Sequence, residues 1–153
     1  MPKIIVRPVA ESDTAALSGL RRLWTEENAG GPVDDPGFEA RFAEWLVRAA
    51  ADRRMWVAAQ ADTGELLGMI NLAVFERMPR PGHGESRWGY LANAYVLPAY
   101  RDCGVGRLLL EELMANARRA GLVRVVLHPS DRAVPFYERA GFGPADMLMA
   151  QSL

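Results

Sequence analysis

The chain has 153 residues, of which 50% are hydrophobic and 24% are charged, and its formal net charge at pH 7 is −1. This composition is ordinary for one folded domain spanning residues 1–153, and the near-neutral charge gives no support for nucleic-acid binding. The apolar runs are too short for a signal peptide or a membrane helix, so we expect no membrane association and a cytoplasmic location. Cys103 is the only cysteine, which excludes an intramolecular disulfide and favours a reducing compartment.

The first fifty residues predict one strand and two helices. A short strand is expected at Ile4–Val6, and Ser12 or Asp13 can cap a helix that runs to about Glu27 with its apolar residues on one face. A glycine-rich break follows this helix. The pair Asp35-Pro36 then predicts the start of a second amphipathic helix, because proline is favoured at the first helical position.

The middle of the chain predicts three strands. Met55–Ala59 and Leu66–Phe75 are separated by a short turn, so we expect them to pair antiparallel. The segment Arg77–Glu85 is rich in proline and glycine and predicts an irregular loop. Gly89–Leu97 predicts the next strand.

The last third of the chain alternates between helix and strand. Helices are predicted at Arg107–Ala120 and Ala133–Ala140, with strands at Val123–Leu127 and Met147–Leu153. Val123–Leu127 is almost entirely apolar, which is typical of a strand buried on both faces. One helix joins Gly89–Leu97 to Val123–Leu127, so these two strands should be parallel. The order of elements indicates the α/β class with a mixed sheet.

A glycine-containing run, Arg101-Asp102-Cys103-Gly104-Val105-Gly106, joins a predicted strand to a predicted helix. A helix N-terminus presents free backbone N–H groups and partial positive charge, and both favour a bound anion. Gly104 and Gly106 lack a Cβ atom, so a phosphate can approach the backbone, and Arg101 adds a forked donor at the rim. The run therefore predicts a site for a phosphorylated ligand.

Two common phosphate-binding motifs do not fit this run. The Walker A motif requires a lysine and a serine or threonine after its last glycine, whereas Arg107-Leu108 follows Gly106. The Rossmann motif would place its third glycine at position 109, which is Leu109. Glycines between a strand and a helix also form plain turns without a ligand, and the pattern alone leaves that alternative open.

Two motifs resemble those of the GNAT superfamily of N-acetyltransferases. Residues 93–106, Asn-Ala-Tyr-Val-Leu-Pro-Ala-Tyr-Arg-Asp-Cys-Gly-Val-Gly, are similar to the family's acetyl-CoA motif, in which a valine and a proline precede R/Q-x-x-G-x-G/A. Residues 136–142, Phe-Tyr-Glu-Arg-Ala-Gly-Phe, resemble the family's Y-E-x-x-G-F. The resemblance covers nearly the whole chain. It implies a GNAT-like fold, with a mixed, mostly antiparallel sheet, a splayed central parallel strand pair and flanking helices.

The resemblance implies acetyl-CoA as the co-substrate. The backbone of Tyr95, Val96 and Leu97 would pair with the pantetheine arm as a further strand would, and an N–H near Val96 would polarise the thioester carbonyl. Many family members carry an asparagine seven residues before the motif tyrosine, and Ser130 stands there in this chain as a weaker cofactor contact. The pyrophosphate would be held by the turn, which comprises Arg101, Asp102, Cys103, Gly104, Val105, Gly106 and Arg107.

Tyr137 is the residue that the resemblance implies for catalysis. When an amine attacks acetyl-CoA the sulfur leaves as a thiolate, and a phenol of pKa ~10 can donate a proton to a developing thiolate. From spacing alone, a half-buried aromatic on a short helix is the better interpretation of Tyr137. Its place in the family motif reverses that preference. No metal is expected, because two widely spaced histidines and one cysteine do not make a metal site.

The general base is left open by the resemblance. Glu26 and Glu27 end the first predicted helix, Glu85 precedes the central strand, and His128 follows the strand Val123–Leu127. Each of these side chains also fits a solvated or structural role. An ordered water that relays the proton is an equal alternative.

We therefore expect direct transfer of acetyl from acetyl-CoA to a primary amine in a ternary complex, with a small molecule or a peptide as acceptor. The loops 28–35 and 77–85 carry charges of both signs and give no acceptor preference. The alternatives are a non-catalytic acyl-CoA-binding or regulatory module on the same fold, and transfer of a larger acyl group. Homodimers are common in the family, but the sequence carries no distinct signal for one.

Overall fold

The structure is a computed structural model that describes all 153 residues. Its sheet has the strand order β1-β2-β3-β4-β5, in which neighbours are antiparallel except for the parallel pair β4 and β5. This confirms the expected fold class and the order of the main elements. The strands and helices are β1 (Ile4–Pro8), α1 (Thr14–Ala29), α2 (Phe38–Ala49), β2 (Arg53–Gln60), β3 (Leu66–Glu76), β4 (Arg87–Val96), α3 (Val105–Arg119), β5 (Val125–Leu127) and α4 (Val134–Arg139).

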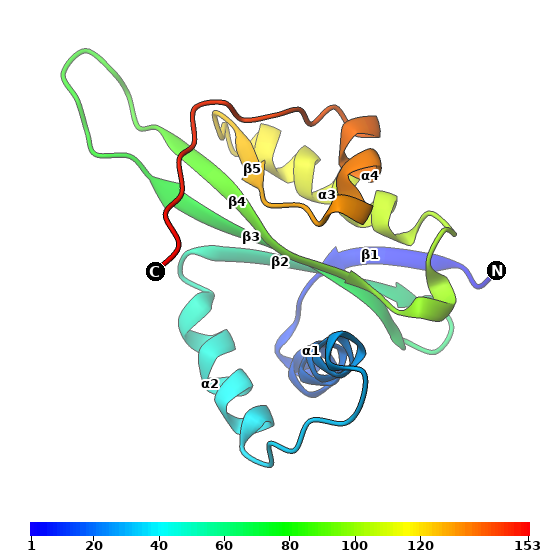
Figure 1. Cartoon of the computed structure of the whole chain (residues 1–153). Coiled ribbons are helices and arrows are strands. Elements are labelled where there is room, and N and C mark those ends of the chain that lie inside the picture. Colours follow the sequence, from blue (N-terminus) through cyan, green and yellow to red (C-terminus); the bar gives the residue numbers. More distant parts are fainter.

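Helices cover both faces of the sheet, with α1 and α2 on one face and α3 and α4 on the other (Figure 1). The central strand β3 is buried from Leu66 to Ala73, since helices pack on both of its faces, and its sequence is accordingly almost continuous in apolar residues. The side chains of β4 enter two different cores. Leu91 packs in the core beneath α3, whereas Tyr95 packs in the core beneath α1 and α2.

The second helix begins later than the sequence predicts. α2 starts at Phe38 with Gly37 at its N-cap, and the expected cap residue Asp35 lies outside the helix. The Asp35 carboxylate instead accepts two hydrogen bonds from Arg41, at 3.1 and 2.6 Å. The helix start predicted at Asp35-Pro36 is therefore too early, and the Asp35 carboxylate is the ion-pair partner of Arg41.

Two expectations for the C-terminal part are also wrong. The predicted strand Met147–Leu153 does not form, and Met149 is fully exposed, so no apolar burial drives this segment to pair. β5 is limited to Val125–Leu127 and is only half-buried, because it pairs with β4 alone and leaves its other edge free. Val123, expected inside the strand, is 57% exposed. No helix of the chain combines the length and apolarity needed to cross a membrane.

A β-bulge interrupts the pairing of β3 with β4. Asn71 is opposite Asn93 and Leu72 is opposite Leu91, so Ala92 is the extra residue on β4. Because side chains alternate between faces along a strand, one extra residue reverses the alternation beyond it. The bulge therefore decides which face each later residue of β4 meets.

Candidate functional site

The two parallel strands separate soon after they meet. β4 pairs with β5 only from Gly89 to Leu91, opposite Val125–Leu127, and then continues to Val96 without a strand on that side. The gap between β4 and β5, hereafter the strand gap, begins beside the Ala92 bulge. The geometry is the splayed pair that the family resemblance implies.

The hydrogen bonds to β3 fix the direction of the free backbone groups of β4. The N–H of Leu97 donates to the carbonyl of Leu67 at 2.9 Å, so this residue faces β3. Hydrogen-bonding direction alternates along an antiparallel strand, so Tyr95 also faces β3 while Ala94 and Val96 face the strand gap. The gap is thus lined by backbone N–H and C=O groups in the spacing that an extended ligand arm would meet.

The turn that follows β4 carries a run of unpaired amides. The backbone N–H groups of residues 102–107 donate no hydrogen bond, and the first N–H of this region to do so is that of Leu108, to the Gly104 carbonyl at 3.0 Å. Gly104 has φ +87° with open space where a Cβ would lie, and Asp102 has φ +59°. Aspartate and glycine are among the residue types that adopt this left-handed conformation most readily, so the sequence suits the sharp turn. The turn is therefore built to offer donors to an anion.

The Arg101 side chain lies elsewhere than at the phosphate rim expected from the sequence. Its Nε donates to the Val96 carbonyl at 3.0 Å, and its two terminal nitrogens donate to the Glu27 carboxylate at 2.7 and 2.9 Å. The guanidinium also lies 5.5 Å from the centre of the Tyr95 ring. In this structure the main chain of the turn supplies the open donors, and the Arg101 side chain ties the turn to α1.

The Glu27 carboxylate accepts hydrogen bonds from two side chains that are distant from it in the sequence. Besides Arg101, it accepts a hydrogen bond from the Tyr95 hydroxyl at 3.0 Å, and the Tyr95 ring stacks on Trp24 with ring centres 5.4 Å apart. The hydrogen bonds from Arg101 lower the pKa of the Glu27 carboxyl, while burial raises the pKa of Tyr95. Glu27 is thus held as a bonded carboxylate, which favours a positioning role over that of a general base.

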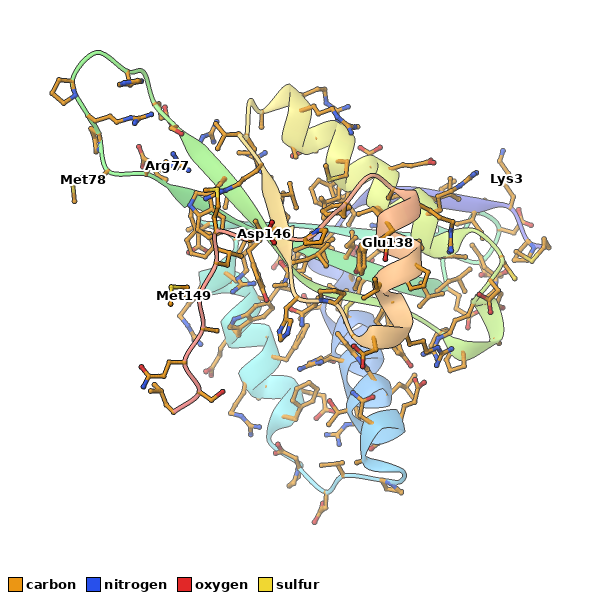
Figure 2. The ribbon with its side chains drawn as sticks, turned by 45° about the horizontal axis from the view of Figure 1, so that its top comes forward. Lys3, Arg77, Met78, Glu138, Asp146 and Met149 are labelled. Atoms are coloured by element: carbon orange, nitrogen blue, oxygen red, sulfur yellow. The ribbon has the colours of Figure 1, made fainter.

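The other candidate bases, Glu26, Glu85 and His128, differ in their hydrogen bonds and in their distance along the chain from the strand gap. Glu26 accepts a hydrogen bond from the Val33 N–H at 3.2 Å and so holds the loop between α1 and α2. Glu85 lies 3.2 Å from Arg87, on the projecting loop that also carries Arg77 (Figure 2). That loop adjoins the end of β4 opposite the turn. His128 is exposed and directly follows β5, where the two parallel strands have diverged.

Tyr137 is buried on α4, with 9% of its surface exposed. Its ring packs edge-on against Phe136 and Phe142, and its hydroxyl makes no hydrogen bond within the chain. Burial raises the pKa of this phenol, so the hydroxyl stays protonated at neutral pH. A Cβ placed on Gly106 would lie 3.6 Å from the Phe136 ring, so α4 packs beside the turn.

Two further residues predicted to contact the cofactor, Ser130 and Cys103, lie on the surface. Ser130 is exposed at the start of the short 3-10 turn before α4, and its side chain makes no capping hydrogen bond. Cys103 is exposed, and its thiol donates to the Arg101 carbonyl at 3.2 Å. Groups of His, Cys, Asp and Glu side chains suited to hold a metal ion do not occur in the structure.

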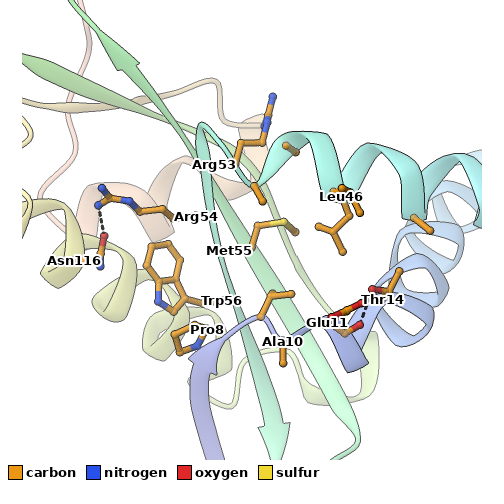
Figure 3. A pocket seen from close by; sticks show the side chains of 15 residues that line it. Pro8, Ala10, Glu11, Thr14, Leu46, Arg53, Arg54, Met55, Trp56 and Asn116 are labelled. Carbon is orange, nitrogen blue, oxygen red and sulfur yellow. Dashed lines mark hydrogen bonds between the residues drawn. The ribbon is translucent and has the colours of Figure 1, made fainter.

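A pocket of about 510 Å³ lies on the α1/α2 side of β1 and β2, and Figure 3 shows the side chains that line it. It is formed where β1 ends and α1, α2 and β2 approach one another, and the Arg54 guanidinium donates to Asn116 at its edge at 2.8 Å. None of the site residues predicted from the sequence lines it. A smaller pocket of about 330 Å³ lies between α1, α2 and strands β2–β4, and includes Asn93 beside the bulge. We assign the smaller pocket to the candidate site because Asn93, one of its lining residues, directly precedes Ala94 at the strand gap.

Comparisons with known proteins agree with this geometry. A family model described as the acetyltransferase (GNAT) family matches residues 17–142. Glucosamine 6-phosphate N-acetyltransferase of Trypanosoma brucei brucei is 32% identical over 91 residues, which is 60% of this chain and 60% of that protein. Glucosamine 6-phosphate N-acetyltransferase 1 of Oryza sativa subsp. japonica is 28% identical over 148 residues, covering 94% of this chain and 84% of that protein.

A solved structure supports the same fold. A predicted acetyltransferase from Clostridium acetobutylicum, solved with acetyl-CoA, superposes with a TM-score of 0.77 at 18% sequence identity. The match covers 98% of this chain and 96% of that chain. At this identity the likeness shows the fold alone.

Proposed function

The chain belongs to the GNAT family of acetyltransferases, and we propose that it transfers an acetyl group from acetyl-CoA to a primary amine by direct attack in a ternary complex. The observation that carries this proposal is the run of unpaired amides at residues 102–107. Such a run at the start of a long helix favours a pyrophosphate, because donors and helix dipole act on the same anion. In this proposal, residues 1–153 form one acetyltransferase domain in a cytoplasmic protein.

The strand gap would receive the reacting end of acetyl-CoA. The N–H groups of Ala94 and Val96 and the Ala94 carbonyl would pair with the amides of the pantetheine arm, whereas the Val96 carbonyl already accepts a hydrogen bond from Arg101. An N–H at Val96 would also stabilise the negative charge that develops on the thioester oxygen when the amine attacks. The fixed backbone supplies this donor without reorganisation during the reaction.

Tyr137 would act as the general acid. The amine nitrogen forms a bond to the acetyl carbon, the carbon–sulfur bond breaks, and the departing thiolate takes the phenolic proton. The unpaired hydroxyl and the raised pKa of Tyr137 both suit a donor that must be protonated before the reaction. His128 or an ordered water is the better choice for the base, since Glu26 and Glu27 are engaged in hydrogen bonds.

The acceptor to test first is glucosamine 6-phosphate, since two relatives are named for its acetylation. Other small amines and peptide amines remain in the proposal. The competing function, a non-catalytic acyl-CoA-binding module, is less favoured because the Tyr137 ring is buried while its hydroxyl has no hydrogen-bond partner in the chain and is not fully enclosed, which leaves it available to a bound cofactor.

Calorimetric titration with acetyl-CoA, followed by a thiol-release assay with a panel of amines, tests the proposal. We expect saturable binding with one site per chain and thiol release that depends on the amine. Binding without amine-dependent thiol release would favour the non-catalytic module. Absence of binding by acetyl-CoA and by succinyl-CoA would overturn the assignment of the turn. A preference for succinyl-CoA would identify a larger acyl group.

A further inference from the structure

One buried side-chain polar atom in the molecule has no hydrogen-bond partner. Asn71 is 1% exposed in the middle of β3, and its Oδ1 atom has no partner in the chain. Its Nδ2 donates to the Oδ1 of Asn93, directly opposite on β4, at 3.3 Å. A buried acceptor without a partner is destabilising, so its presence in a central strand calls for a ligand or another explanation.

The Ala92 bulge brings the second asparagine to the same place. Leu91 packs in the core beneath α3, and without the bulge Asn93 would follow it onto that face. With the extra residue, Asn93 points instead to the α1/α2 face, where it lines the smaller pocket together with Asn71. The bulge beside which the strand gap begins thus also places the second polar side chain on the floor of the pocket.

The rest of this pocket is aromatic and positively charged. Its lining includes the rings of α2 and two arginines, Arg21 and Arg41, and contains no carboxylate. Arg41 is engaged by Asp35, but Arg21 forms no ion pair and lies 4.7 Å from the centre of the Trp24 ring. A volume of about 330 Å³ is that of a site for a small molecule. The pocket therefore combines an uncompensated cation with an unsatisfied amide oxygen.

We propose that this pocket binds the acceptor and selects a small, hydroxylated amine that carries an anionic group, of which a phosphorylated amino sugar is the model. Arg21 would pair with the anionic group, and the Oδ1 of Asn71 would accept a hydrogen bond from the amine or a hydroxyl. Asn93 precedes Ala94, so an amine held on this floor lies beside the strand gap. The inference rests on the proposed acetyl transfer and assigns its specificity to named residues.

The test compares glucosamine 6-phosphate with glucosamine in wild-type protein and in Arg21→Gln. Binding of each amine to the protein saturated with coenzyme A is measured by calorimetry, and kcat/KM is measured for each. We expect the wild type to prefer the phosphorylated amine, and Arg21→Gln to reduce that preference about 10- to 100-fold, as for loss of a charge-assisted hydrogen bond. Arg21→Lys should restore part of the preference.

Two further variants separate recognition from folding. Arg48→Gln removes an exposed arginine of α2 that does not line the pocket, and should leave the preference unchanged. Asn71→Leu keeps a similar volume without the unsatisfied oxygen. This variant should keep or raise the unfolding temperature while weakening the binding of both amines about 10-fold.

The outcomes distinguish this inference from the proposed function. Equal binding of the two amines by the wild type, or an unchanged preference in Arg21→Gln, would overturn the inference while acetyl transfer to amines stands. Failure of acetyl-CoA to bind would overturn the proposed function. The amine titrations on the free protein would then still decide whether the pocket takes an anionic amine.

Discussion

The α3/α4 face of the sheet and the α1/α2 face carry different kinds of site. On the first, a turn with two glycines offers main-chain amides, and the groups involved are close together in the sequence. On the second, side chains from distant segments meet, as when Glu27 binds Arg101 or Asn71 faces Asn93. A main-chain site leaves a short motif in the sequence, whereas a side-chain site depends on strand register and helix packing.

The largest effect that we expect from this comparison is a loss of acetyl-CoA affinity on substitution of Gly104. Gly104→Glu would place a carboxylate among the unpaired amides of the turn. We expect the affinity for acetyl-CoA to fall about 100-fold or more, since charge-assisted hydrogen bonds to the anion are lost and like charges are brought together. Calorimetric titration measures the change.

Gly121→Glu is the matched control for that variant. Gly121 ends the same helix, has φ +71° and also has open space where a Cβ would lie, so both substitutions impose the same backbone strain. The control should lose comparable stability but bind acetyl-CoA normally. Equal loss of binding in the two variants would mean that strain, and not the anion site, explains the effect.

The second largest effect is a loss of kcat on substitution of Tyr137, which also lies on the α3/α4 face. Tyr137→Phe should lower kcat by roughly 10- to 1000-fold with little change in acetyl-CoA affinity, as expected for the loss of a general acid. Tyr100→Phe removes another hydroxyl, one that accepts a hydrogen bond from Gln60, and should leave kcat unchanged. Steady-state kinetics would contradict the assignment if the two variants behaved alike.

The smallest effect is a change in the free energy of unfolding, and it is expected for the ion pair between Glu27 of α1 and Arg101 of the turn. The pKa of Glu27 is lowered in the folded protein, so its pairing stabilises the fold above the ordinary pKa near 4.5, and this contribution disappears as the pH falls through the folded value. Both side chains of the pair are partly exposed, and solvent screening limits the cost of Glu27→Gln to about 0.5–1 kcal/mol at pH 7.

Urea unfolding at pH 7 and at pH 3 checks this prediction. The deficit of Glu27→Gln relative to the wild type should be present at the higher pH and smaller at the lower. Glu44→Gln, which changes an exposed carboxylate without an ion pair, should show no deficit at either pH. A deficit of equal size at both values would show that Arg101 is not the source of the stabilisation.

The sequence predicted the fold class, the element order and the parallel pair, because apolar periodicity and glycine turns report local structure. It did not predict that Arg101 turns back onto Glu27, because 74 residues separate these side chains and no local pattern links them. Asn71 and Asn93 were missed for a related reason. Each is a single polar residue in an apolar strand, and only the register and the Ala92 bulge place them opposite each other.

The expected strand at Met147–Leu153 shows the limit of a periodic pattern. Apolar residues in that segment suggest a strand, but a strand also needs an edge to pair with and a surface to cover. The free edge of β5 is available, but the segment covers no apolar surface and does not pair, and Met149 remains fully exposed (Figure 2).

The alternation along β4 gives one strand two rates of hydrogen exchange. Tyr95 and Leu97 bond to β3 and should hold their amide protons for as long as the sheet stays closed, whereas Ala94 and Val96 face the strand gap without a partner. Deuterium should therefore enter every second amide of a central strand early. A ligand arm that pairs with β4 would slow those positions alone, so the strand itself reports whether the gap is filled.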